Sequence, residues 1–219
     1  MSKYAKAFVV GGWGETEEYI QGLTNEIQLE EGPHGFVEHA EGITLAEALR
    51  HKRVINKDAE KRLVVTHSAG IMAIDNAGVI VALNGPEPTL LPRTIMGGRR
   101  VIRECNITPD DYVTKTSAWD GVDEVLHHPV TWAVPFLVQC FSTVRKLARH
   151  ERAFPGGRIY LQTESDEFGF GSGDNIEWAR QNGIIADMLP GFHNQPMLRP
   201  REGAEQISIA LARLTVLQR

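Results

Sequence analysis

Short apolar runs alternate with amphipathic stretches along most of the chain, which is the pattern of parallel strands connected by helices. No internal repeat interrupts this alternation. We therefore predict an α/β protein with a mainly parallel six-stranded sheet and helices on both faces. The runs that predict strands are Ala5 to Val10, Gly35 to His39, Arg62 to Thr66, Val79 to Leu83, Arg158 to Thr163 and Ile184 to Leu189.

Helix signals occupy the intervals between these runs. Thr16 to Ile27 places Tyr19, Leu23 and Ile27 on one stripe, as an amphipathic helix requires. Thr44 and Glu47 have the spacing of a capping box, which predicts a helix through about His51. The remaining predicted helices are Ala69 to Ala77, about Asp174 to Asn182 and about Arg201 to Leu217.

The interval from Glu87 to Gly156 breaks the alternation. It contains no convincing strand, but has helical stretches at about Asp110 to His127 and Pro135 to Arg149. Parallel sheets carry their sites at the carboxyl ends of the strands. We therefore predict a single domain over residues 1–219, in which a helical lid at about 87–156 shapes substrate choice.

Composition narrows the possible partners. The chain has 219 residues, a hydrophobic fraction of 42%, a charged fraction of 23% and a net charge of -5, as expected of a soluble domain. The negative charge argues against nucleic acid and anionic membranes, and no apolar run is long enough to span a membrane. Cys105 and Cys140 lack metal-type spacing and indicate reduced thiols. We expect a soluble cytoplasmic protein, and the sequence does not indicate its oligomeric state.

The run "RLVVTHSAGIMAI", from Arg62 to Ile74, places Ser68 between a predicted strand and a predicted helix. A strand-turn-helix elbow exposes a nucleophilic serine, and small residues two positions before and after it allow close packing. Gly70 meets this requirement, whereas Thr66 stands where glycine is usual. The alternative is that Ser68 only caps the helix.

Two further candidates follow other strands. Asp166 lies just past the strand from Arg158, and His193 follows the last strand. A serine nucleophile needs a base and a group that orients that base, and the order Ser, Asp, His is that of hydrolases built on such an elbow. Glu164 and Glu167 are rivals for the acid, but the offset from the strand favours Asp166.

Backbone donors for an oxyanion are also present. The first predicted strand ends in Gly11-Gly12-Trp13-Gly14, so the N–H of Trp13 is one candidate. The N–H of Ala69, directly after Ser68 at a helix N-terminus, is the other. We expect His67 to pack or to form a hydrogen bond near the elbow.

Nothing in the sequence predicts a metal or an organic cofactor. His127 and His128 adjoin Pro129 without acidic or cysteine partners at ligand spacing. The glycine-rich segment Gly169 to Asn175 follows the acid loop and lacks the lysine of a phosphate-binding loop, so we interpret it as a loop and helix cap.

Four motifs resemble those of the α/β-hydrolase superfamily, and most closely those of its small single-domain serine esterases. "VVGGWGET" is similar to the oxyanion loop, "VVTHSAG" to the elbow, "YLQTESDEF" to the acid loop and "LPGFHNQPMLRP" to the histidine loop. The resemblance implies a three-layer fold. Thr66 departs from the family pattern, and the usual N-terminal hairpin is absent, which implies a trimmed sheet.

The resemblance and the residues together predict a serine hydrolase that cleaves a small-molecule ester or thioester through Ser68, His193 and Asp166. An amidase or a hydrolase of C–C bonds would share these residues. A non-catalytic binding protein on the same scaffold is the alternative from a different class, and Thr66 is its main support.

Overall fold

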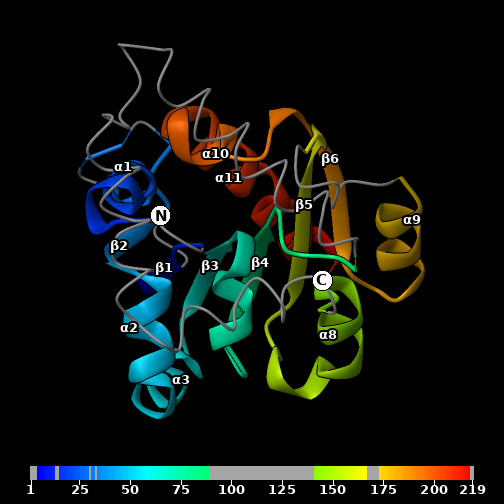
Figure 1. Cartoon of the computed structure of the whole chain (residues 1–219), viewed down its shortest axis with the longest axis horizontal. Coiled ribbons are helices and arrows are strands. Elements are labelled where there is room, and N and C mark those ends of the chain that lie inside the picture. Colours follow the sequence, from blue (N-terminus) through cyan, green and yellow to red (C-terminus); the bar gives the residue numbers. More distant parts are fainter. Residues whose placement is uncertain are drawn as a thin grey trace.

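The computed structural model describes residues 4–12, 15–29, 31–32, 34–88, 141–166 and 173–217. All strand pairs within this part of the chain are parallel, and the order in the sheet is β2-β1-β3-β4-β5-β6 (Figure 1). The strands are β1 (Tyr4–Val10), β2 (Val37–Ile43), β3 (Leu63–His67), β4 (Val79–Leu83), β5 (Arg158–Ser165) and β6 (Ile185–Phe192). All six predicted strands are confirmed, with shifted ends at five of them.

Helices cover both faces of this sheet. Side chains alternate across a strand, so Val9 of β1 packs on one face while Phe8 and Val10 pack on the other. Helices α1 (Glu17–Ile27), α10 (Gln195–Leu198) and α11 (Pro200–Leu217) cover the first face. The second face carries α2 (Leu45–Arg50), α3 (Lys52–Ala59), the 3₁₀ helix η1 (Ser68–Ala73), α8 (Thr143–Arg149) and α9 (Gly173–Gln181); a further 3₁₀ turn, η2, spans Glu151–Ala153.

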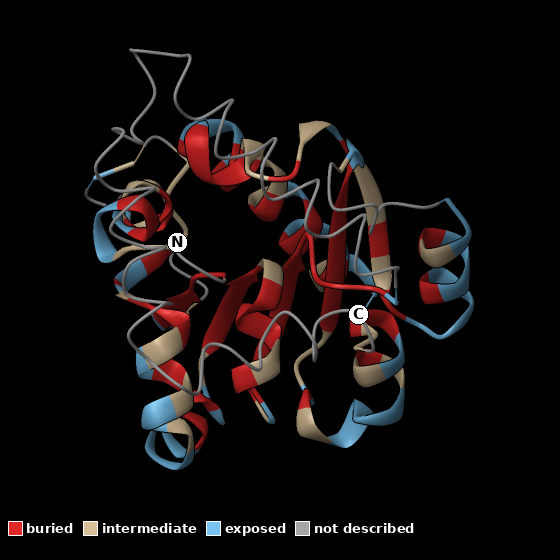
Figure 2. Cartoon of the chain, in the orientation of Figure 1, coloured by how far each residue is buried: buried red, intermediate tan, exposed pale blue. Residues whose placement is uncertain are grey.

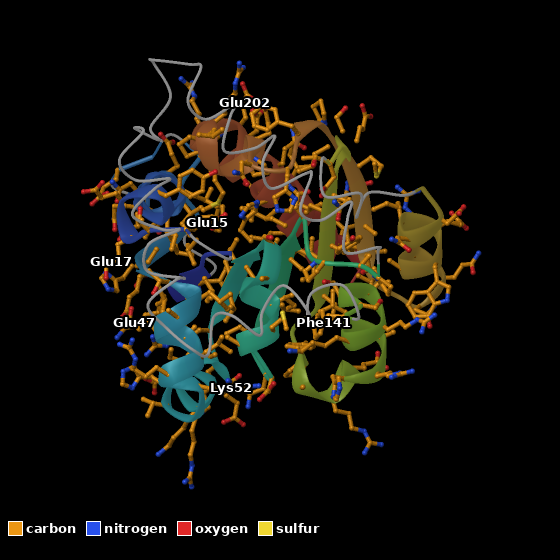
Figure 3. All side chains as sticks on the ribbon, in the orientation of Figure 1. Glu15, Glu17, Glu47, Lys52, Phe141 and Glu202 are labelled. Atoms are coloured by element: carbon orange, nitrogen blue, oxygen red, sulfur yellow. The ribbon has the colours of Figure 1, made fainter. Side chains whose placement is uncertain are left out.

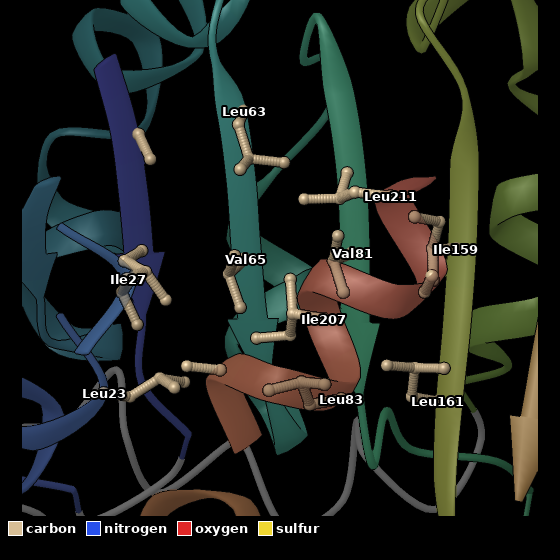
Figure 4. Close-up of a cluster of buried hydrophobic side chains, with 14 of the residues drawn as sticks. Leu23, Ile27, Leu63, Val65, Val81, Leu83, Ile159, Leu161, Ile207 and Leu211 are labelled. Atoms are coloured by element: carbon tan, nitrogen blue, oxygen red, sulfur yellow. The ribbon is translucent and has the colours of Figure 1, made fainter. Parts of the chain in front are cut away.

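Burial follows the three layers. The central strands β3 and β4 are fully buried, whereas the edge strands β2 and β6 are partly exposed, and the outer sides of the helices are exposed (Figure 2). Figure 4 shows α1 and α11 contributing aliphatic side chains over the middle strands. Burial on both faces therefore explains why β4 and the first three residues of β3 are apolar without alternation.

The helix predicted over Ala69 to Ala77 is wrong in type and in length. Its place is taken by η1, which ends at Ala73 and is followed by extended backbone at Ile74. The buried side chain of Asn56 explains this end: its Nδ2 donates to the carbonyl of Ala73, and its Oδ1 accepts from the N–H groups of Asp75 and Asn76. A side chain on α3 thus replaces the hydrogen bonds that a longer helix would make.

The predicted lid falls largely on residues 89–140, which lie outside the described residues. The two ends of the predicted lid, at residues 87–88 and 141–156, are described. The buried side chain of Glu87 joins them. Oε2 of Glu87 accepts from the hydroxyl of Ser142 at 2.6 Å, and Oε1 accepts from the N–H of Val144 at 2.8 Å. Burial raises the pKa of Glu87 to about 7, although these hydrogen bonds lower it.

We expect stability to fall between pH 5 and pH 8 because of Glu87. The folded state binds this proton more tightly than the unfolded chain, so the stabilisation is present at low pH and lost as pH rises through about 7. Relative to Glu87→Gln, which keeps one donor and one acceptor, the wild type should lose about 3 kcal/mol over this range. Urea unfolding at several pH values measures the difference. Equal pH dependence in the two proteins would contradict this role of Glu87. Glu41→Gln, at an exposed position of β2, is the control.

Candidate active site

Ser68 lies directly after β3 with a φ of 48°, in the left-handed region that non-glycine residues rarely adopt. Such a conformation costs of order 1–3 kcal/mol and persists only where the surrounding structure enforces it. The residue is half-buried. The sharp turn therefore places Ser68 at the carboxyl edge of the sheet.

Two glycines allow the close packing around this turn. A Cβ on Gly70 would lie 2.5 Å from the carbonyl oxygen of Val10, and a Cβ on Gly12 would lie 2.7 Å from the Cβ of Ser68. Glycine is therefore required where η1 passes the end of β1. Thr66 is accommodated because its buried side chain lies toward β4, where Oγ1 donates to the carbonyl of Val81 at 3.5 Å.

Asp166 and His193 meet on the loops that follow β5 and β6. Oδ2 of Asp166 lies 2.8 Å from Nδ1 of His193, and the two side chains are 0% and 2% exposed. A carboxylate at this place accepts a hydrogen bond from Nδ1–H, which keeps the proton on Nδ1 and leaves Nε2 as the basic nitrogen. Of the two alternative acids, Glu164 is exposed and Glu167 lies outside the described residues.

A buried hydrogen-bond chain holds the Asp166 carboxylate. Burial raises the pKa of Tyr160 well above its usual value, so its phenol stays protonated and donates to Oε1 of Gln162 at 2.6 Å. The amide of Gln162 is thereby oriented so that Nε2 donates to Oδ2 of Asp166 at 2.6 Å. Two donors, Gln162 and His193, thus converge on one carboxylate oxygen.

The loop that carries His193 is tied to the neighbouring strand ends. Asn84, which follows β4 with a φ of 48°, donates from Nδ2 to the backbone carbonyl of His193, and its Oδ1 accepts from the N–H of Thr163 at 2.7 Å. The ring of His67 lies 5.0 Å from the ring of His193 between centroids. The elbow and the histidine loop are therefore adjacent.

Of the two predicted oxyanion donors, Ala69 is among the described residues and Trp13 is not. Ala69 is buried and is the second residue of η1, immediately after Ser68. Trp13 lies outside the described residues, but Gly12 beside it adjoins Ser68, as noted above. The loop after β1 therefore lies next to the candidate nucleophile.

The sequence did not single out Glu15, which is labelled in Figure 3. Its side chain is partly buried and contacts the ring of His67. An acid shortly after a glycine-rich loop looks like an ordinary helix-start residue, so only the fold reveals this contact. His67 itself was predicted to pack or to form a hydrogen bond near the elbow, and both of its ring nitrogens have partners.

Two further predictions concern metals and membranes. Across the described ranges, no three His, Cys, Asp or Glu residues gather as a metal site would require. Cys105, Cys140, His127 and His128 lie outside these ranges. No helix in the described part of the chain has the length and apolar character to cross a membrane.

Comparison with known proteins identifies the architecture. No family model and no curated protein matches the sequence. Among solved structures, a thermophilic esterase has a TM-score of 0.58 at 14% identity, and a structure described with carboxylesterases of the thaumarchaeon Nitrososphaera gargenis has 0.58 at 12%; each match covers 97% of this chain and 92% of the other. A proline iminopeptidase of Mycobacterium smegmatis has 0.57 at 12%, covering 100% and 93%.

These neighbours share the layered architecture with this chain across nearly its whole length. At identities this low, the structural match establishes the fold alone. The resemblance read from the four sequence motifs is confirmed at the level of the fold class. The chain has the α/β-hydrolase fold.

Proposed function

We propose that this protein is a serine hydrolase that cleaves a carboxylic ester or thioester. The observation that supports the proposal most strongly is the buried contact between Asp166 and His193, 2.8 Å from Oδ2 to Nδ1, on loops next to the turn at Ser68. A carboxylate in this place fixes the histidine tautomer that accepts a proton at Nε2. Catalysis needs this tautomer, whereas a binding site has no use for it.

In the first half of the proposed reaction, Oγ of Ser68 attacks the acyl carbon while Nε2 of His193 takes the hydroxyl proton. The Asp166 carboxylate stabilises the imidazolium that forms. The backbone N–H groups of Trp13 and Ala69 donate to the tetrahedral oxyanion. His193 then gives the proton to the leaving alcohol or thiol, and the C–O or C–S bond breaks to leave an acyl ester on Ser68.

In the second half, a water molecule attacks the acyl ester and His193 takes its proton. The tetrahedral intermediate collapses, Oγ of Ser68 leaves as the proton returns to it, and the carboxylic acid is released. Each proton moves between named groups, so these steps require no metal and no organic cofactor.

Labelling with a fluorophosphonate probe tests the proposal. We expect the native protein to gain one adduct, which peptide mapping by mass spectrometry places on Ser68, and the heat-denatured protein to gain none, because only an activated serine reacts. A panel of aryl esters and thioesters graded by acyl length then identifies the preferred substrate class.

The alternative has a clear signature in the same experiment. If the native protein stays unlabelled and hydrolyses no member of the panel, a non-catalytic binding role on this scaffold replaces the proposal. Labelling at another serine would instead reject Ser68 as the nucleophile.

A further inference from the structure

Behind the candidate nucleophile lies an ionisable pair that the proposed mechanism does not use. The side chain of His67, at the end of β3, is 0% exposed, and that of Glu15, on the loop between β1 and α1, is 9% exposed. Oε1 of Glu15 contacts Nδ1 of the His67 ring. A buried carboxylate and imidazole are costly to desolvate unless each is satisfied by partners.

The partners of the ring determine where its protons lie. Nε2 of His67 is 3.0 Å from the backbone carbonyl of His193, which only accepts, so Nε2 carries a proton. Nδ1 faces a carboxylate whose other oxygen, Oε2, accepts from the N–H of Gly12 at 2.6 Å. A doubly protonated ring beside an ionised Glu15 satisfies all three contacts at once.

Electrostatics agree with this arrangement. Complete burial of the ring by itself lowers the pKa of His67, but the adjacent Glu15 carboxylate and the hydrogen bonds outweigh the burial and raise it above the usual value. Asp166, on the loop after β5, adds a smaller effect in the same direction. The titratable groups that face His67 are thus Glu15, Asp166 and His193.

These contacts link the end of β3 to the two loops that lie next to Ser68. Glu15 holds Gly12, where a Cβ would lie 2.7 Å from the Cβ of Ser68, while His67 holds the backbone of the loop that carries the candidate base. We propose that Glu15 and His67 form a buried imidazolium–carboxylate pair that positions the oxyanion loop and the histidine loop around the nucleophile. This inference rests on the proposed function for its catalytic consequence, and both members are positioning residues.

The pair has a consequence for pH dependence. When His67 loses its proton at alkaline pH, the lone pair on Nδ1 faces the Glu15 carboxylate, and the two repel each other. The loops then lose their common anchor, so kcat should decline as pH rises through the raised pKa of His67.

Three variants of Glu residues test the pair. We expect Glu15→Ala to lower kcat about 10- to 100-fold with little change in KM, because small misplacements of reacting groups carry costs of this size. Glu15→Gln should restore most of kcat, since its amide oxygen accepts from Gly12 while its NH₂ donates to a neutral His67 ring. It should also abolish the alkaline decline. Glu17→Gln, an exposed acid two positions along (Figure 3), is the matched control.

A spectroscopic measurement makes the test independent of turnover. We expect ¹⁵N NMR of the imidazoles at pH 6, below the raised pKa of His67, to show both ring nitrogens of His67 protonated in the wild type and one protonated in Glu15→Gln. His67→Gln assigns the signal. A neutral His67 in the wild type would overturn the pair even in a fully active enzyme.

The kinetic outcomes separate the two proposals. If the wild type is labelled at Ser68 and Glu15→Ala keeps full kcat while remaining folded, the positioning role is wrong and the proposed function stands. If the wild type is neither labelled nor active but His67 is doubly protonated, the pair exists and the proposed function fails. If Glu15→Ala does not fold, then an alkaline decline that persists unchanged in Glu15→Gln rejects the positioning role.

Discussion

Ser68→Ala is expected to lower kcat on the best aryl ester by about 10⁵- to 10⁶-fold, because no neighbouring group can replace the attacking oxygen. The substitution removes one atom at a half-buried position, and alanine meets the same strain as serine at a φ of 48°. The fold and KM should therefore change little. Steady-state kinetics, with thermal unfolding as the check on folding, measure the effect.

Ser165→Ala is the matched control for this substitution. Ser165 is an exposed serine at the end of β5, directly before Asp166, and its replacement removes the same atom near the same edge of the sheet. Its kcat should stay within about twofold of the wild type, as is usual for surface changes. Ester hydrolysis that survives in Ser68→Ala at a comparable rate would remove Ser68 from the mechanism.

The sheet was predictable because buried parallel strands leave a strong signal. Val79–Leu83 is an unbroken apolar run, and the strand has the predicted ends. The ends of β5 and β6 extend beyond the apolar runs, since Ser165 and Phe192 are paired across a register shift that hydrophobicity does not encode. Local sequence therefore located the strands, but tertiary pairing set their ends.

The helices show where local signals are insufficient. Thr44 caps α2 as predicted, with its Oγ1 accepting from the N–H of Glu47 at 3.2 Å. The stretch after Ser68 carries helix-forming residues, yet its 3₁₀ helix ends at Ala73, where Asn56 supplies competing hydrogen bonds from α3. The sequence near Ser68 does not predict these hydrogen bonds with Asn56, because they are tertiary contacts.

In the candidate site too, some features follow from strand order and others depend on tertiary contacts. Ser68, Asp166 and His193 each follow a predicted strand, so topology alone brings them to one edge. The contact between Glu15 and His67 joins residues 52 positions apart and depends on how the loop after β1 folds against the end of β3. Strand order predicts which loops are neighbours, but it does not predict which side chains within them meet.

Asp166→Asn is expected to lower kcat by about 10³- to 10⁴-fold with the fold retained. Both Gln162 and His193 donate to Oδ2 of Asp166. If the asparagine oxygen takes that position, both bonds survive but the negative charge that stabilises the imidazolium is lost. If the amide nitrogen takes it, two donors face each other at Gln162 and the histidine is driven into the wrong tautomer. Kinetics on the same ester, beside urea unfolding, measure the loss.

The acids on either side test whether this role belongs to Asp166. Glu164 is exposed at the end of β5, so Glu164→Gln should leave kcat within about twofold of the wild type. Glu167→Gln completes the set. Full activity in Asp166→Asn together with its loss in either glutamine variant would transfer the role to the corresponding glutamate. Loss in Asp166→Asn alone would indicate that the buried carboxylate beside His193 is the one that orients the base.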